Sequence, residues 1–208
     1  MPIICPTITA SSEQYESYII DYCKFAKRIH IDLSDGIFSP NKTLALSEIY
    51  WPYNVLADLH LMYQDPVQYI DEIISLKPNL VIVHAEVDMN IQSFAKAMKE
   101  NDIKVGLALL AETPVAIIAP VIEFIDHVLV FSGKLGFYGG VANLELTGKV
   151  KQLKELKPEL EIAWDGGINP DTQKSIIEAG VDVLDVGGYI AGSENSREAY
   201  DKLVEGIA

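Results

Sequence analysis

The sequence has little cysteine and no long apolar run. Only Cys5 and Cys23 are cysteines among its 208 residues, and they form no Cys-x-x-Cys pair. This excludes a disulfide scaffold or zinc finger and predicts two reduced, buried side chains in a cytoplasmic protein. No apolar stretch approaches the ~20 residues that cross a bilayer, and residues 1–10 do not have the pattern of a signal peptide. We therefore expect neither a signal peptide nor a membrane anchor.

Positive charge is also scarce. Sixteen Lys and Arg residues stand against thirty Asp and Glu residues, which gives a formal net charge of −14 at pH 7. A nucleic-acid backbone or an anionic membrane would be repelled overall, so neither is an expected partner. The hydrophobic content of 49% is enough for one large core and excludes a disordered chain. A small anionic substrate would need a local site that overcomes the repulsion.

Short apolar or β-branched runs recur through the chain and alternate with segments of helical periodicity. Continuous apolar runs favour strands that are buried on both faces, and their alternation with helices favours parallel pairing. Eight repeats fit an α/β fold, a closed (β/α)8 TIM barrel in a single domain over residues 1–208. The alternative, an open doubly wound sheet, more often has a glycine-rich turn after its first strand, and none is present here. The predicted strands are residues 3–5, 29–33, 55–61, 80–83, 105–109, 128–131, 162–164 and 181–184, and the predicted helices are 12–27, 66–76, 90–100, 147–156, 170–179 and 196–207.

Ionisable side chains gather at the carboxyl ends of the predicted strands, where active sites of such barrels lie. Period-two spacing places His30 and Asp32 on one face of the second strand, and His60 and Asp165 belong to the third and seventh strands. Each histidine could instead be a core residue bonded to a carbonyl. Two imidazoles and two carboxylates at matching strand ends favour a divalent metal site, with Zn²⁺ first and Fe²⁺, Mn²⁺ or Co²⁺ as alternatives.

The same residues predict a reaction. A metal bound to the oxygens of an α-hydroxy ketone lowers the pKa of the adjacent C–H and stabilises the enediolate that forms. Asp32 and Asp165 lie on strands that are distant around the barrel, so one can remove a proton from one face while the other returns a proton to the opposite face. The result is inversion at carbon, an epimerisation that needs no redox cofactor.

Glycine clusters follow the predicted sixth, seventh and eighth strands. Backbone N–H groups in such turns can approach a phosphate closely, and phosphate sites in these barrels often lie after strands seven and eight. A single pair of glycines is more often a plain tight turn, but three clusters at adjacent strand ends predict a phosphate cradle. Its members are Gly136, Gly139, Gly140, Gly166, Gly167, Gly187 and Gly188.

Four segments resemble the ribulose-phosphate 3-epimerase family, metal-dependent (β/α) barrels of the pentose phosphate pathway. They occur in family order over almost the whole chain, and the first two are fairly specific. Related barrel decarboxylases and synthases have an Asp-x-Lys-x-x-Asp motif whose lysine is absent here. The segments are residues 29–41 (IHIDLSDGIFSPN), 58–62 (DLHLM), 83–86 (VHAE) and 164–169 (WDGGIN).

The resemblance implies an isomerase that interconverts D-ribulose 5-phosphate and D-xylulose 5-phosphate and assembles as a homo-oligomer. It implies that the glycine clusters hold the sugar phosphate, and that Thr7, His60 and Met62 contact the substrate, with Thr7 at the position of a usual serine. It further implies that both aspartates act as acid and base. The implied metal ligands are His30, Asp32, His60 and Asp165.

The chain also departs from the family pattern. Ser34 and Phe131 stand at two positions that usually hold methionine, and residues 134–140 lack the usual proline and glutamine of their loop. Gly188 stands where a serine is usual. These changes leave open a ketohexose 6-phosphate substrate of the allulose 6-phosphate type. A non-catalytic barrel that binds a sugar phosphate is a third hypothesis, against which the intact set of four residues argues.

Four further polar residues have more than one interpretation. His84 and Glu86 are as compatible with a supporting or core role as with catalysis, and Lys134 fits a solvated loop cation better than a phosphate contact. His127, at the start of the predicted sixth strand, lies at the wrong end of the barrel for catalysis. We expect His127 to be structural.

Overall fold

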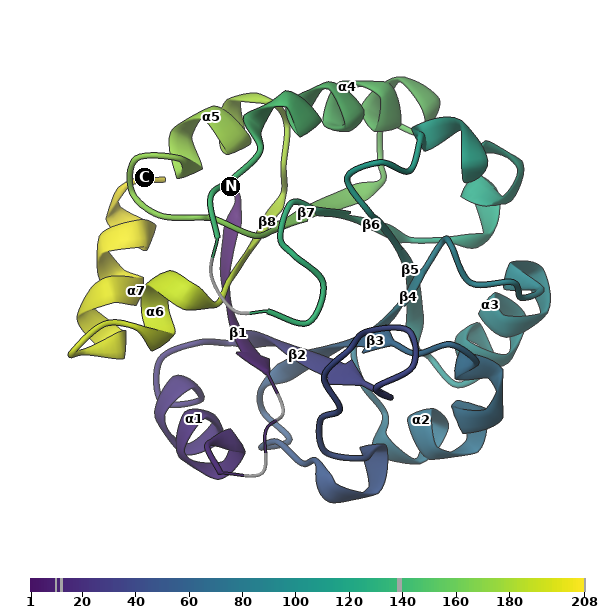
Figure 1. Ribbon diagram of the computed structural model, residues 1–208, viewed down its shortest axis with the longest axis horizontal. Coiled ribbons are helices and arrows are strands. Elements are labelled where there is room, and N and C mark those ends of the chain that lie inside the picture. Colours follow the sequence, from purple (N-terminus) through teal and green to yellow (C-terminus); the bar gives the residue numbers. More distant parts are fainter. Residues whose placement is uncertain (10, 12, 138–139, 208) are drawn as a thin grey trace.

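In the computed structural model, which describes residues 1–9, 11, 13–137 and 140–207, eight parallel strands form a closed barrel (Figure 1). Each strand pairs with the next in the chain, and the last pairs with the first. The expected TIM barrel is thereby confirmed, and the doubly wound alternative is wrong. The strands are β1 (Ile3–Thr9), β2 (Arg28–Ser34), β3 (Leu56–Met62), β4 (Leu80–His84), β5 (Lys104–Leu109), β6 (His127–Phe131), β7 (Glu161–Asp165) and β8 (Val183–Val186).

Helices surround the barrel on the outside (Figure 1). Each predicted helical segment contains an α-helix, although the first is shorter than residues 12–27 because Gln14 supplies no side-chain cap and a turn follows Tyr22. The α-helices are α1 (Tyr15–Tyr22), α2 (Ile70–Leu76), α3 (Ile91–Lys99), α4 (Thr147–Leu156), α5 (Gln173–Glu178), α6 (Gly188–Ala191) and α7 (Ser196–Glu205).

Short 3-10 helices take the place of an α-helix in two connections. Between β5 and β6, Pro114 precedes η3 (Val115–Ile117) and Pro120 lies in the first turn of η4 (Ala119–Phe124). Proline lacks a backbone N–H, so a continuous α-helix is disfavoured there. The connection from β2 to β3 holds only η1 (Leu46–Glu48) and is otherwise an extended loop, which reaches the mouth of the barrel. The remaining 3-10 helices, η2 (Pro66–Tyr69) and η5 (Leu144–Leu146), directly precede α2 and α4.

Alternation along the strands separates two apolar layers. Side chains of one parity pack between the sheet and the helices in the large core cluster, which includes Ile31, Leu59 and Trp164. Side chains of the other parity fill the inside of the barrel, because successive residues of a strand point to opposite faces. The apolar members of this inner layer are Cys5, Leu80, Ile82, Ala108, Leu129, Ala163 and Val183.

A buried ionic network lies at the amino ends of the strands. Arg28 bonds to Asp58 (Nε to Oδ2, 2.6 Å) and to both carboxylate oxygens of Glu161 (2.9 and 2.7 Å). Nδ1 of His127 lies 2.8 Å from Oε2 of the same glutamate. Because these residues begin β2, β6 and β7, His127 lies at the end of the barrel opposite the predicted active site, as expected.

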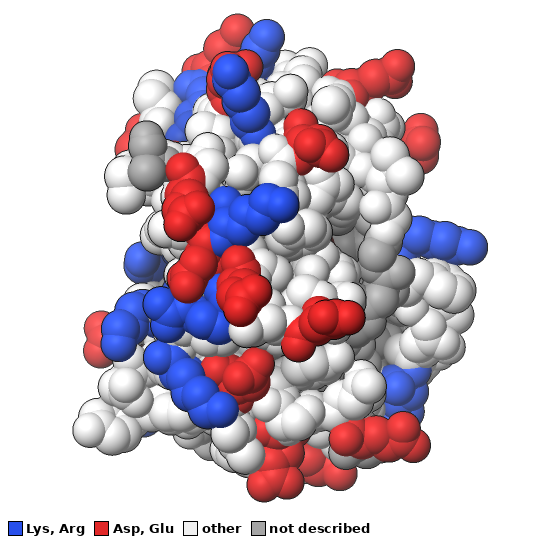
Figure 2. Space-filling model, turned by 90° about the vertical axis from the view of Figure 1, so that its left-hand side faces the viewer, with Lys and Arg blue, Asp and Glu red and all other residues white. Residues whose placement is uncertain are grey.

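Charged side chains of both signs intermingle on the face that carries α1, α6 and α7 (Figure 2). Exposed pairs on this face include Lys24 with Asp21 and Arg197 with Asp201. Exposed pairs of this kind contribute only about 0–1 kcal/mol each to stability. Among the described residues, the structure contains no helix with the length and apolar character of a membrane span.

Candidate active site

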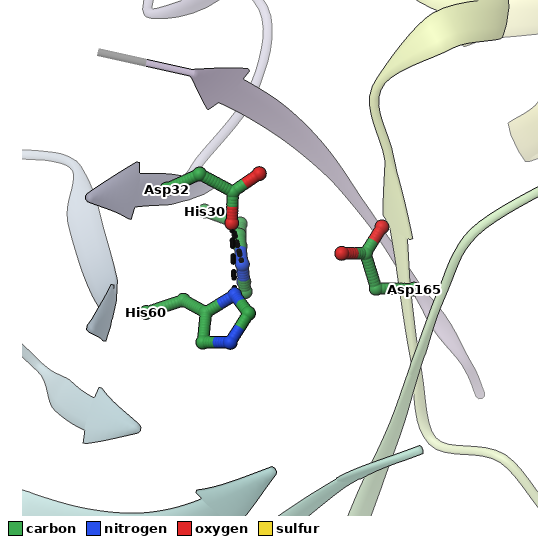
Figure 3. A group of neighbouring side chains, drawn as sticks. All are labelled: His30, Asp32, His60 and Asp165. Carbon is green, nitrogen blue, oxygen red and sulfur yellow. Dashed lines mark hydrogen bonds and ion pairs between the residues drawn. The ribbon is translucent and has the colours of Figure 1, made fainter. Parts of the chain in front are cut away.

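Four side chains converge at the carboxyl-terminal half of β2, β3 and β7 (Figure 3). Oδ1 of Asp32 lies 3.0 Å from Nε2 of His30 and 2.9 Å from Nδ1 of His60. Asp165 faces these three from across the barrel, and one ligand atom from each of the four lies within 4.8 Å of all the others. The structure therefore brings together the four residues that strand-end spacing singled out.

The geometry of this cluster suits a divalent ion. Nitrogen and carboxylate ligands bind Zn²⁺ at about 2.0–2.2 Å, so two ligands of one ion can be at most about 4.4 Å apart. A contraction of a few tenths of an ångström brings the donor atoms, now within 4.8 Å, into that range. Imidazole and carboxylate donors suit Zn²⁺, Fe²⁺, Mn²⁺ and Co²⁺. His30, Asp32, His60 and Asp165 are thus fit to hold such an ion.

The two histidines of the cluster differ in charge. Burial lowers the pKa of His30, but the carboxylates of Asp185 and Asp32 outweigh this effect and raise it to about 10. Burial lowers the pKa of His60 to about 4, because Asp32 offsets it only in part. At neutral pH, His60 is therefore a neutral imidazole with a lone pair available, whereas His30 must give up a proton to become a ligand.

The pKa values of the two aspartates are shifted in opposite directions. Burial raises the pKa of Asp32, but hydrogen bonds from His30 and His60 hold it well below its usual value. Burial and the neighbouring Asp32 charge raise the pKa of Asp165 well above its usual value. The pKa values of the two carboxyl groups are thus moved apart, the arrangement that separates a base from an acid in one site.

A cavity of about 340 Å³ opens above the cluster. This volume falls within the range of about 300–1,000 Å³ that is typical of small-molecule sites. His60 is fully buried and is not among the residues that line the cavity, and its substrate contact stays a prediction. Gly139 lies outside the described residues. The other predicted site residues that line the cavity are Thr7, Asp32, Met62, Gly136, Gly140, Asp165, Gly166, Gly167, Gly187 and Gly188.

Two glycines after β7 allow backbone to pack directly on backbone. Gly166 and Gly167 have φ values of +110° and +71°, in the region that disfavours L side chains. A Cβ atom at Gly166 would lie 2.3 Å from the backbone nitrogen of Gly133, and one at Gly167 would lie 2.0 Å from that of Ala142. The turn after β7 therefore forms a seat for the loop that follows β6.

Several cavity residues were not identified from the sequence. Thr9 follows Thr7 at period two, so strand alternation was a signal for it. Asp185 is 2% exposed and lies inside the apolar run of β8, which gave no sign of a site. The remaining unpredicted polar residues, which come from two loops and α6, are Asn41, Thr43, Asn169 and Tyr189.

The structure also places the residues whose roles the sequence left open and those that depart from the usual pattern. Nε2 of His84 lies 2.9 Å from Nε2 of His60, and Nδ1 of His84 lies 3.3 Å from Oε2 of Glu86, so both residues stand behind the cluster. Phe131 lines the cavity, whereas the Ser34 hydroxyl accepts a hydrogen bond from the backbone of Gly36. The exposed Lys134 lies 4.5 Å from the centre of the Phe137 ring.

Comparisons with known proteins agree with this geometry. A model of the family described as ribulose-phosphate 3 epimerase matches residues 4–191. The ribulose-phosphate 3-epimerase of Bacillus subtilis (strain 168) is 32% identical over 183 residues, which cover 84% of either chain. The cytoplasmic isoform of Oryza sativa subsp. japonica is 30% identical over 188 residues (86% of this chain, 82% of the relative). A chloroplastic enzyme of Arabidopsis thaliana is 29% identical over 216 residues (95% and 74%).

Solved structures share the architecture. The crystal structure of a 3-hexulose-6-phosphate synthase matches with a TM-score of 0.72, over 99% of this chain and 100% of its own. The sequence identity is 17%, so this likeness supports the barrel fold alone.

Proposed function

The chain belongs to the ribulose-phosphate 3-epimerase family, and from this premise we propose that it interconverts D-ribulose 5-phosphate and D-xylulose 5-phosphate. The observation that carries the proposal is the cluster of two histidines and two aspartates, with Asp32 and Asp165 on opposite sides of the cavity. A site that only bound the sugar would need no pair of opposed carboxylates. The activity belongs to the isomerase class, like that of the named relatives.

The two aspartates divide the proton transfer. The charged Asp32 takes the proton from C3 on one face of the substrate, which leaves an enediolate. Asp165, in its protonated form, delivers a proton to C3 from the opposite face, so the configuration inverts and one proton is taken for each one given. In the reverse direction the two residues exchange roles. Opposite pKa shifts of the two groups support this division.

His30, Asp32, His60 and Asp165 would hold one divalent ion, for which we propose Zn²⁺. When bound, the ion would polarise the ketone oxygen and stabilise the negative charge of the enediolate. The buried His30 and His60 lie within hydrogen-bond distance of Asp32, which lines the cavity. Thr7, whose buried hydroxyl lines the cavity, is placed to bind a substrate oxygen.

The phosphate would lie against the glycine turns after β6, β7 and β8. Gly136, Gly166, Gly167, Gly187 and Gly188 line one region of the cavity wall, where their backbone can approach an anion without intervening side chains. Uncharged N–H groups would bind the phosphate, so the net charge of −14 does not oppose it locally. The two free cysteines and the cytoplasmic relative support a place in the cytoplasmic pentose phosphate pathway.

Proton exchange with solvent tests the proposal. In D₂O, the wild type with Zn²⁺ should incorporate one deuterium at C3 of ribulose 5-phosphate and form xylulose 5-phosphate in a coupled assay. Asp165→Asn should lose both activities by at least about 10³-fold, because the amide cannot deliver the proton. The matched control is Asp88→Asn, an exposed aspartate in the loop after β4, which should retain wild-type rates.

Three outcomes would contradict parts of the proposal. Faster turnover of allulose 6-phosphate than of ribulose 5-phosphate would move the substrate to the ketohexose phosphates. Metal-free protein with full activity would exclude the role of the ion. Neither deuterium incorporation nor bound metal in the wild type would refute the enzyme and leave a sugar-phosphate-binding barrel.

A further inference from the structure

The second ring nitrogen of His60 points away from the cluster and is bound by groups outside it. Nδ1 of His60 faces Asp32, while Nε2 lies 2.9 Å from Nε2 of His84. Both imidazoles are fully buried, and the rings of Phe38 and Phe131 lie 4.5 and 6.3 Å from that of His84, centre to centre. Apolar rings thus help to shield the contact between the two histidines from water.

A hydrogen-bond chain continues from His84 to Glu86. Nδ1 of His84 lies 3.3 Å from Oε2 of Glu86. The other oxygen, Oε1, accepts hydrogen bonds from the backbone N–H of Leu110 (3.0 Å) and the hydroxyl of Thr113. Burial raises the pKa of Glu86, but these donors together with His84 hold it below its usual value. Glu86 is therefore a carboxylate, which can only accept hydrogen bonds.

The carboxylate fixes the direction of the first hydrogen bond in the chain, and metal ligation fixes that of the second. Because Glu86 cannot donate, Nδ1 of His84 must carry a proton. When Nδ1 of His60, which faces Oδ1 of Asp32 at 2.9 Å, is a metal ligand, the single proton of that ring is on Nε2. Nε2 of His84, which lies 2.9 Å away, must then accept the hydrogen bond. A chain that runs from His60 through His84 to Glu86 therefore matches the ligand form of His60.

We propose that His84 and Glu86 are positioning residues that hold His60 in the tautomer with its proton on Nε2, so that Nδ1 is a ready metal ligand. The inference rests on the metal site of the proposed function and assigns a role to two residues outside that site. Groups that bind the second nitrogen of a metal-ligating histidine typically change metal affinity about 10- to 100-fold when they are replaced.

Three substitutions distinguish an effect of hydrogen-bond direction from an effect of side-chain packing. Glu86→Gln supplies an amide that can donate to His84 and so reverse the chain. His84→Leu removes the chain, whereas His84→Gln keeps one acceptor for His60 and one donor for Glu86. Thr113→Val is the matched control, because it removes a partner of Glu86 and leaves the carboxylate in place.

The first measurement is the dissociation constant of Zn²⁺, by competition with a chromophoric chelator. We expect Glu86→Gln and His84→Leu to weaken binding about 10- to 100-fold. His84→Gln and Thr113→Val should stay within about threefold of the wild type. Thermal unfolding of the metal-free proteins checks that each variant is folded. Wild-type affinity in Glu86→Gln, or equal losses in His84→Gln and His84→Leu, would overturn the proposal.

The second measurement needs no variant. Long-range ¹H–¹⁵N correlation spectra of the imidazoles show which nitrogen carries the proton. In the wild type with Zn²⁺ bound, His60 should be protonated on Nε2 and His84 on Nδ1. A proton on Nε2 of His84 in this state would overturn the inference while the epimerase proposal stands. A wild type that binds no Zn²⁺ would overturn the inference and the zinc site of the proposed function.

Discussion

The close contact between Gly167 and the loop that follows β6 allows a quantitative prediction. In Gly167→Ala the new Cβ would lie 2.0 Å from the backbone nitrogen of Ala142, well short of the 3.4 Å at which ordinary contact begins. An L side chain in the left-handed region costs about 1–2 kcal/mol, and overpacking costs about 1–3 kcal/mol more. The matched control is Gly180→Ala, outside the cavity lining, where φ is +105° but the new Cβ would lie at ordinary contact distances of 3.7 Å from Val150 and 3.9 Å from Lys154. Only the backbone strain is common to both variants.

The overlap is removed at the lowest free-energy cost when the surface loop that follows β6 moves away from residue 167. If the substrate requires the loop in its seat, binding must restore the overlap and its cost of about 1–3 kcal/mol. Since 1.4 kcal/mol is a factor of ten, the KM for ribulose 5-phosphate should rise about 5- to 150-fold in Gly167→Ala. In Gly180→Ala the KM should stay within about threefold of the wild type.

Steady-state kinetics and urea unfolding of both variants provide the check. Urea unfolding should report a loss of about 1–2 kcal/mol in Gly180→Ala from backbone strain. Equal KM values in the two variants, with the whole cost of Gly167→Ala seen in global unfolding, would refute the reasoning that the loop rests on this glycine.

Two further predictions concern the ionic network at the amino ends of the strands. Arg28→Met should reduce the free energy of unfolding in urea by about 3–5 kcal/mol, because the buried Asp58 loses its cation; a loss below about 1 kcal/mol would contradict this. Burial raises the pKa of Glu161, but hydrogen bonds from Arg28 and His127 hold it below its usual value. A carboxyl group with a lowered folded pKa stabilises the protein above its unfolded pKa of about 4.3, and this contribution is lost as the pH falls through the folded value. The stability advantage of the wild type over Glu161→Gln should therefore shrink below about pH 4.3, and an advantage that is constant down to pH 2 would contradict the assignment.

The barrel and the four-residue cluster could be predicted because both depend on short periodicities. Alternation along β2 places His30 and Asp32 on one face, and parallel strands bring their carboxyl ends to one side of the barrel. His60 and Asp165 then follow from their places near the ends of β3 and β7. A sequence can carry such information because it is local to each strand.

Other parts of the site depend on contacts between distant segments. Asp185 lies within an apolar run, and nothing next to it in the chain shows that it faces His30 at 3.3 Å. The role of Glu86 depends on Leu110 and Thr113, which follow a different strand. Opposite pKa shifts of Asp32 and Asp165 arise from burial, from the bonds of Asp32 to His30 and His60 and from the charge of Asp32 near Asp165, and none of these can be read from the sequence alone.

The loop after β6 touches its seat through backbone atoms, and this has an evolutionary consequence. Gly166 and Gly167 would meet the backbone of Gly133 and Ala142, so the contact does not depend on which side chains the loop carries. Side chains between these two points can change without disturbing how the loop is supported. The sequence of this loop, which forms part of the cavity wall, can then vary while its backbone support stays the same. Grafting other loop sequences between residues 134 and 141 offers a direct route to new sugar-phosphate specificities.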